Sequence, residues 1–262
     1  MQEYKITDQF LHQLSQLIAK VNQAYLPHED DDSHTNLYFD EVGKRITGRW
    51  FGGQDSKYLL VFDLLNWEYQ VLDEKLNALV AISQSGKTLD QTESEVVTFL
   101  QKFGFQVEGL SKPLHYKIPV YSFLKEKINK PDSRSLESWM AVRGLANQAN
   151  RLVLGYLQQE AEIRIWPHHF DTGLYVEVNS EVGIGFGLAI ADLMVDGPYF
   201  YLAGYALKNK TWNWEKVTEL AEGEWIISEG WKGAVLPITE VNREKLNLPG
   251  YIQSALAWYL VG

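Results

Sequence analysis

The sequence predicts an α+β protein, an internally duplicated helix–antiparallel sheet–helix unit forming two similar halves about a pseudo-twofold axis. Three observations predict this fold. Apolar residues recur at helical spacing in four stretches and at strand-like spacing between them. Short sequence matches recur in the same order along the chain. A proline-containing polar stretch at 111–134 indicates a linker between a first α+β repeat at 1–110 and a second at 135–262.

Four helices are expected from the apolar periodicity. They cover residues 7–25, 90–103, 135–159 and 251–261. Thr7 or Asp8 is the predicted N-cap of the first helix, and Pro27 follows its end. Asp90 and Glu93 stand at capping-box spacing and predict where the second helix begins.

Strands are expected where β-branched and aromatic residues alternate with polar ones between glycine breaks. In the first half these stretches are 36–42, 45–51, 57–65 and 67–72. In the second half they are 162–166, 172–179, 183–190 and 199–207, followed by a tryptophan-rich irregular region and a Gly233–Pro237 segment.

The duplication hypothesis depends on short matches between the halves. Leu37–Asp40 matches Leu174–Glu177, and Asn66–Glu68 matches Asn213–Glu215. The same alignment sets Leu26–His28 opposite Trp166–His168. It therefore predicts that the acidic loop from His28 to His34 and the turn at 166–171 occupy equivalent places.

Composition excludes several classes of function. The formal net charge is −10, from 34 acidic and 24 basic residues without a basic cluster, so nucleic acid is not an expected partner. The absence of cysteine excludes disulfides and thiolate chemistry. The start of the sequence has no signal-peptide pattern and no stretch is apolar enough to span a membrane, so we expect an acidic, cytoplasmic protein.

One stretch, Trp166–Asp171, brings histidine, carboxylate, proline and tryptophan together. On an extended segment, His169 and Asp171 share one face, which predicts a catalytic pair with His169 as base and Asp171 orienting it. A structural corner is the alternative, in which Asp171 caps a turn. Trp166 and His168, with Tyr199 and Tyr201, are the expected ligand-binding residues.

A metal is a further alternative for the same stretch, because histidine and aspartate are both metal ligands. Two ligands do not make a site. The nearest candidates for a third are His34, Glu177, Asp192 and Asp196. With no third ligand fixed by the sequence, no metal ligand is assigned and the cofactor stays unknown.

Several motifs after residue 135 occur together. They are Trp-Pro-His-His-Phe-Asp at 166–171, a glycine-spaced strand at 183–187, Gly-Pro-Tyr-Phe-Tyr at 197–201, and Trp-Lys-Gly-Ala-Val-Leu-Pro at 231–237. In these motifs the chain resembles an uncharacterised bacterial family, known only as a domain of unknown function, with a Trp-Pro-His-His-Phe-Asp signature. The resemblance implies a shared fold and a site at the motif. It implies no reaction.

Three other motifs have competing interpretations. The stretch Ala81–Thr88 fits a degenerate phosphate-binding loop, but the predicted helix starts too late for one. The alternate glycines of Gly183–Gly187 lack the context of a dinucleotide site, and indicate close backbone approach, a bulge, or a floor beneath a ligand or a tryptophan. The tryptophans of 212–231 are typical of core packing, and a ligand pocket or contact surface is the alternative.

The function itself is not determined by these patterns. The expected function is small-molecule binding in a pocket near 166–171. The alternatives are a hydrolase-like enzyme that uses His169 and Asp171, with or without a metal, and an interaction protein that uses the 212–231 segment. The oligomeric state stays unknown.

Overall fold

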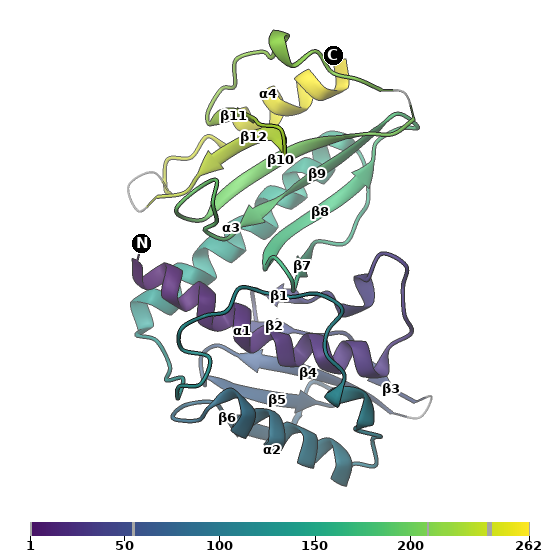
Figure 1. Cartoon of the computed structure of the whole chain (residues 1–262), viewed down its shortest axis with the longest axis vertical. Helices are drawn as coiled ribbons and strands as arrows, with labels where there is room; N and C mark the ends of the chain where they lie inside the picture. The colour runs from purple at the N-terminus through teal and green to yellow at the C-terminus, as the bar shows by residue number, and fades with distance from the viewer. Residues whose placement is uncertain (1, 54–55, 209, 240–242, 262) are drawn as a thin grey trace. The chain divides into compact units, whose positions relative to one another are not determined.

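The computed structural model describes residues 2–53, 56–208, 210–239 and 243–261. The chain divides into two compact units. The first unit consists of Gln2–Ala141 and Arg164–Phe170, and the second of Val142–Ile163 and Asp171–Gly262. Each unit combines helices with an antiparallel sheet (Figure 1), which confirms the predicted α+β class. The Trp166–Phe170 turn, predicted within the second repeat, packs with the first unit.

The sheet of the first unit is an antiparallel meander. Its strands lie in the order β1 (Tyr38–Asp40), β2 (Arg45–Thr47), β4 (Lys57–Asp63), β5 (Glu68–Leu72) and β6 (Ala78–Ser83), with the short β3 (Phe51–Gly52) paired to β4. The central strands are buried on both faces, so their sequences read as continuous apolar runs. A further short strand, β7 (Arg164–Trp166), joins this unit through a bridge between Leu37 and Ile165.

Helices α1 (Gln2–Tyr25) and α2 (Leu89–Lys102) pack on the sheet of the first unit (Figure 1). The Tyr69 hydroxyl, from β5, donates to the Leu14 carbonyl of α1 at 2.6 Å. An ion pair of 2.7 Å between Lys20 and Glu93 connects the two helices.

The predicted N-caps of both helices are wrong. Helix α1 already includes Thr7, whose hydroxyl bonds within the helix to the Glu3 carbonyl at 2.9 Å. The Asp8 carboxylate instead accepts the Trp139 indole N–H at 2.8 Å. Helix α2 is capped by Thr88, which forms a capping box with Gln91 and so places Asp90 inside the first turn.

The segment predicted as a linker, 111–134, packs against the first unit. It follows a short 3-10 helix, η2 (Glu108–Ser111). The Tyr121 hydroxyl lies 2.7 Å from His12 Nδ1, and the Tyr116 hydroxyl donates to Gln16 at 3.0 Å. Ile128 is buried and forms a β-bridge with Lys87. These contacts hold the segment in place along α1 and the start of α2.

The second unit contains a second antiparallel sheet. Its strands lie in the order β11 (Glu224–Ile227), β12 (Lys232–Pro237), β10 (Tyr199–Ala206), β9 (Val182–Ala189) and β8 (Asp171–Glu177). Helix α3 (Ser133–Leu157), from Val142 onward, and helix α4 (Leu248–Val261) pack on one face of this sheet. A short 3-10 helix, η3 (Trp214–Lys216), precedes β11. Arg143 of α3 donates to the Thr172 hydroxyl at 2.7 Å, and Gln253 of α4 bonds to Tyr156 of α3 at 2.9 Å.

The alternate glycines of Gly183–Gly187 form a floor for tyrosine rings. A Cβ at Gly185 would lie 2.8 Å from the Tyr205 ring, and one at Gly187 would lie 2.7 Å from the Tyr201 hydroxyl. The expectation of close approach at these glycines is confirmed, but the rings that lie on them are tyrosines and not the expected tryptophan or ligand. The dinucleotide interpretation is wrong, because β9 continues into an antiparallel hairpin and no helix follows it.

The short matches behind the duplication hypothesis agree with the structure only in part. Leu37–Asp40 and Leu174–Glu177 both overlap strands, β1 and β8, but the second match falls on different kinds of element. Asn66–Glu68 leads into strand β5, whereas Asn213–Glu215 overlaps the 3-10 helix η3. The strand orders of the two sheets also differ, because β10 pairs with β12 and β11 lies at the edge in the second sheet, whereas the strands of the first sheet, apart from the short β3, follow one another in sequence order. The internal duplication therefore stays a prediction.

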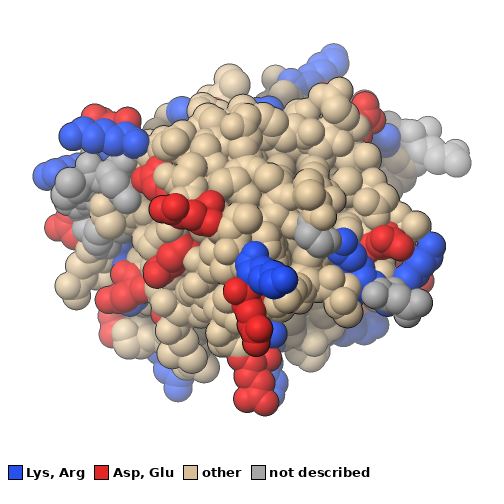
Figure 2. Space-filling model, turned by 90° about the horizontal axis from the view of Figure 1, so that it is seen from above, with Lys and Arg blue, Asp and Glu red and all other residues tan. Residues whose placement is uncertain are grey.

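Among the described residues, no helix is long and apolar enough to cross a membrane. Figure 2 shows one face of the molecule, on which lysine and arginine side chains lie scattered among acidic and uncharged ones. The dispersed charge agrees with the absence of a basic cluster in the sequence.

Candidate metal centre

The six histidines of the chain all belong to the first unit, although they are far apart in sequence. They are His12, His28, His34, His115, His168 and His169. Three segments carry five of them: the loop after α1, the segment at 111–134, and the turn after β7. The candidate site is built where these segments meet.

Two aspartates stabilise the turn in the loop after α1. Asp32 has a left-handed backbone, with φ of 57°, a conformation that aspartate tolerates better than most residues. The Asp31 carboxylate accepts the Ser33 N–H at 3.0 Å, and the 3-10 helix η1 (Ser33–Thr35) follows. Arg164 of β7 donates to Asp31 at 3.4 Å. The acidic loop is therefore held by hydrogen bonds to its own backbone and to β7, while residues 28–31 stay exposed.

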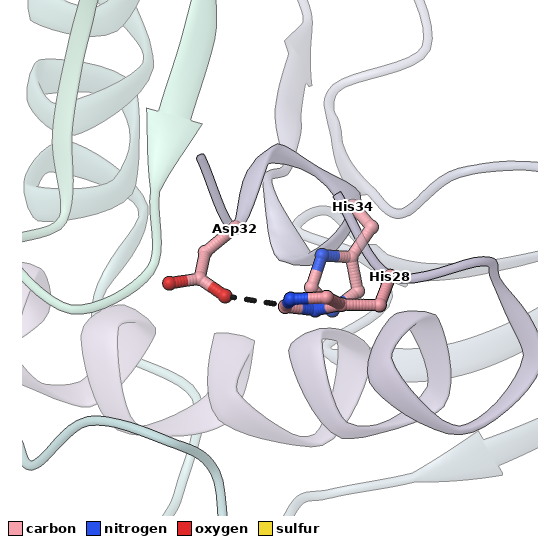
Figure 3. Close-up of side chains that lie close together, drawn as sticks. All are labelled: His28, Asp32 and His34. Carbon is pink, nitrogen blue, oxygen red and sulfur yellow. Dashed lines mark ion pairs between the residues drawn. The ribbon is translucent and has the colours of Figure 1, made fainter. Parts of the chain in front are cut away.

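Two histidines and one carboxylate of this loop form a compact group. Ligand atoms of His28, Asp32 and His34 all lie within 4.8 Å of one another, and we call these residues the candidate metal site. His28 Nδ1 lies 3.9 Å from Asp32 Oδ1. Figure 3 shows the two imidazole rings close together, with the Asp32 carboxylate directed toward them.

The environment differs between the two rings of the candidate metal site. His34 is buried, and the Glu29 N–H donates to its Nδ1 at 3.3 Å, which orients the ring. Burial of the ring, followed by the nearby His28, lowers the pKa of His34. His28 is largely exposed. The site therefore has one fixed ligand and one face open to solvent.

A fourth group comes from the segment at 111–134. His115 Nε2 lies 3.2 Å from Asp32 Oδ2, so the two oxygens of Asp32 face histidines from different segments. The His34 and His115 rings are 6.4 Å apart between centroids. Sequence separation hides this contact, because His115 lies in a segment predicted to be a linker.

The turn at 167–170 is held to α1 by its backbone. The Pro167 carbonyl accepts a hydrogen bond from Gln16 Nε2 at 2.8 Å and lies 2.9 Å from His12 Nε2. His12 also stacks on Phe170, with ring centroids 5.1 Å apart. Phe170 has a left-handed backbone, with φ of 56°. His12 thus has a structural role that the sequence did not reveal.

His168 and His169 follow Pro167 on this turn, and their ring centroids are 4.3 Å apart. His168 lies 5.5 Å from the Tyr116 ring and is half-buried, whereas His169 is exposed. Burial of the ring, with a smaller effect from the neighbouring His169 and His115, lowers the pKa of His168 to about 4. His168 is therefore neutral over the physiological pH range.

The geometry behind the predicted His169–Asp171 pair is wrong. Residues 167–170 form a turn rather than an extended strand, so alternation does not place His169 and Asp171 on one face. Asp171 begins β8 in the second unit, where its carboxylate accepts the Tyr201 hydroxyl at 2.6 Å. A catalytic role for these two residues stays a prediction.

The predicted binding residues are divided between the units. Trp166 and His168 belong to the first unit, and Tyr199 and Tyr201 to the second. The Tyr199 hydroxyl donates to Asp192 at 2.7 Å. Of the four residues considered as a third metal ligand, Glu177, Asp192 and Asp196 are in the second unit, and His34 is in the candidate metal site.

The phosphate-loop interpretation of Ala81–Thr88 receives no support from the geometry. Residues 81–83 belong to β6, an edge strand of an antiparallel sheet, and helix α2 begins directly after Thr88. Lys87, the residue that would contact phosphate, pairs with Glu95 at 2.7 Å. Its side chain is thus directed along α2.

The tryptophans of 212–231 pack largely among themselves and on α4. Trp214 and Trp225 lie 4.6 Å and 5.0 Å from the Trp258 ring of α4. Trp212 donates its indole N–H to the Tyr259 carbonyl at 3.1 Å. These contacts agree with the packing interpretation of the segment.

Comparison with known proteins gives no relative. No protein-family model matches the chain, and no match was found among curated proteins or solved structures. The function is therefore inferred from the site alone.

The candidate metal site also corresponds to a sequence pattern, which is less conspicuous than the motif at 166–171. His28, Asp32 and His34 have the spacing His-x3-Asp-x-His directly after a helix and a proline. On a tight turn this spacing can bring three ligands together, as the structure shows. No comparable signal marks His115.

Proposed function

We propose that this protein binds a divalent transition-metal ion, with zinc as the best match, through His28, Asp32 and His34. The observation that carries the proposal is the approach of their three ligand atoms to within 4.8 Å of one another. Imidazole and carboxylate together suit zinc and related transition metals better than calcium or magnesium, which prefer oxygen ligands.

Two histidines and one carboxylate leave a coordination position for water or a substrate group. Zinc sites with three protein ligands and an open position are typical of hydrolytic enzymes, in which the ion lowers the pKa of bound water and polarises a carbonyl or phosphoryl oxygen. The exposed face of His28 gives access to such a position. The expected small-molecule ligand would bind there, and metal-assisted hydrolysis is the chemistry that this ligand set favours.

Equilibrium dialysis of metal-free protein against zinc, followed by elemental analysis, tests the proposal. Wild-type protein should retain zinc, and Asp32→Asn and His34→Ala should each lower the affinity at least about tenfold because a ligand is lost. Asp30→Asn is the matched control, since it removes the same charge from the same loop outside the three-residue site. Equal zinc retention by all four proteins would contradict the proposal, as would a wild-type protein that retains none.

A further inference from the structure

Asp32 has one contact that lies outside the three-residue metal site. Its Oδ1 lies 3.9 Å from His28 Nδ1 within the site, whereas its Oδ2 lies 3.2 Å from His115 Nε2. An ionised carboxylate can only accept hydrogen bonds, so the His115 ring is the donor in this pair. His115 does not belong to the group of three ligand atoms, and its ring centroid is 6.4 Å from that of His34. His115 therefore acts on the site through Asp32.

The residues around His115 are bonded to helix α1. The Pro113 carbonyl accepts a hydrogen bond from Gln23 Nε2 at 3.2 Å. The Tyr116 hydroxyl donates to Gln16 Oε1 at 3.0 Å. The Tyr116 ring also meets the His115 ring edge-on, with centroids 4.8 Å apart. These contacts hold the imidazole where its N–H reaches the carboxylate.

The side chain of Asp32 is 42% exposed, so packing alone does not fix its orientation. A carboxylate in this position can turn about its own side-chain bonds, and only some of its orientations direct Oδ1 toward an ion. An N–H at Oδ2 fixes the plane of the carboxylate and leaves Oδ1 for the ion. Carboxylate ligands of metals are commonly hydrogen-bonded in this way, and loss of such a partner typically lowers the metal affinity about 10–100-fold.

We propose that His115 is a positioning residue for the candidate metal site: it donates to Asp32 Oδ2 and so holds Oδ1 in place as a zinc ligand, without binding the ion itself. The inference rests on the proposed function and deepens it, because it makes the 111–134 segment part of the metal site. The zinc affinity then depends on the docking of this segment on α1. By the same linkage, bound zinc stabilises the docked segment.

The zinc affinity of three variants, measured by competition with a chelating dye, tests the role of His115. His115→Ala should lower the affinity about 10–100-fold, because Asp32 loses its donor. His115→Gln should recover most of the wild-type affinity, since its amide nitrogen lies about as far along the side chain as Nε2 and also donates. His169→Ala, at an exposed histidine, is the matched control and should bind zinc like the wild type.

Cobalt distinguishes a positioning residue from a ligand, because the visible absorption spectrum of bound Co²⁺ depends on the coordinating groups. At saturating Co²⁺, His115→Ala should give the wild-type spectrum, whereas His28→Ala should give a changed one. Circular dichroism shows whether each variant is folded. If the alanine variant does not fold, His115→Asn replaces it, since its amide ends too near the backbone to reach Oδ2.

The outcomes separate the two proposals. Wild-type zinc affinity in His115→Ala would overturn the positioning role and leave the candidate metal site intact. Equal losses of affinity in His115→Ala and His115→Gln would also overturn it, because a hydrogen-bond donor would then not be what Asp32 needs. A changed Co²⁺ spectrum in His115→Ala would show that His115 is itself a ligand. No zinc binding by the wild type would overturn both proposals.

Discussion

His12 differs from the other histidines because both of its ring nitrogens have protein partners. One nitrogen lies 2.7 Å from the Tyr121 hydroxyl and the other 2.9 Å from the Pro167 carbonyl, and the ring is fully buried. A metal would have to displace one of these bonds. The residue therefore serves to hold the turn at 167–170 and the 111–134 segment on α1.

His12→Leu should lower the free energy of unfolding by about 1–3 kcal/mol, because the Tyr121 hydroxyl loses its buried partner. The measurement is urea denaturation in the presence of a chelator. His169→Leu, at an exposed histidine, should change the stability by less than about 0.5 kcal/mol. Equal effects of the two substitutions would contradict the structural role given to His12.

Because the pKa of His168 is lowered, we expect the stability of the metal-free protein to depend on pH. Its folded-state pKa of about 4 lies below the unfolded value of about 6.5, so the unfolded chain binds a proton between these values that the folded chain does not. Stability should therefore rise with pH across this window. The lowered pKa of His34 acts in the same direction.

The urea midpoint of chelator-treated protein should accordingly be lower at about pH 5 than at about pH 7.5. His168→Gln removes one titrating group and should reduce this difference. If His168→Gln keeps the full wild-type difference, burial of His168 is not its cause.

At the residue scale, the sequence predicted which residues belong to the site better than it predicted their arrangement. His28, His34 and His168 stand out in the sequence by their types and neighbours. The predicted pairing of His169 with Asp171 assumed an extended strand, in which alternate side chains share a face. Phe170 has a left-handed backbone instead, and the sequence pattern does not predict this conformation. His115 was missed because its contact with Asp32 depends on tertiary folding.

At the scale of elements, apolar periodicity located the four α-helices of the described chain and most of its strands, but β6, β11 and β12 were not predicted as strands. Helix starts were less well predicted, since Thr88 and Asp90 both stand at capping spacing and only the backbone conformation selects Thr88. Edge strand β6 is largely exposed and thus lacks the alternation that marks half-buried strands.

Gly204 shows how packing of an element depends on one small residue. It lies on β10 beneath α4, and a Cβ there would lie 2.3 Å from a Tyr259 ring atom. Gly204→Ala should cost about 1–3 kcal/mol of stability, because α4 must shift away from the sheet. Denaturation followed by tryptophan fluorescence reports this directly, since the rings beside Tyr259 would move with it.

Gly155→Ala is the control for this prediction. Gly155 lies in α3, and an added Cβ there would meet open space among the described residues, so alanine should stabilise the helix by up to about 1 kcal/mol. Destabilisation by both substitutions would show that glycine itself, rather than the contact with Tyr259, determines the effect.

At the scale of the whole molecule, the α+β class followed from composition and periodicity, but the division into units did not. The turn at 167–170 packs with the first unit because His12 and Gln16 of α1 hold its Pro167 carbonyl. Hydrogen bonds of this kind between distant segments leave no local signal in a sequence. They also explain why the histidines of three segments meet in one unit.

Histidine side-chain NMR during a zinc titration tests the central claim most directly. With the six imidazole signals assigned by single substitutions, zinc should first shift those of His28 and His34, while the signal of buried His12 stays unchanged. This result would place the ion at the ligands that the structure brings together. Zinc-dependent shifts confined to other histidines, or no shifts at all, would contradict the proposed metal site.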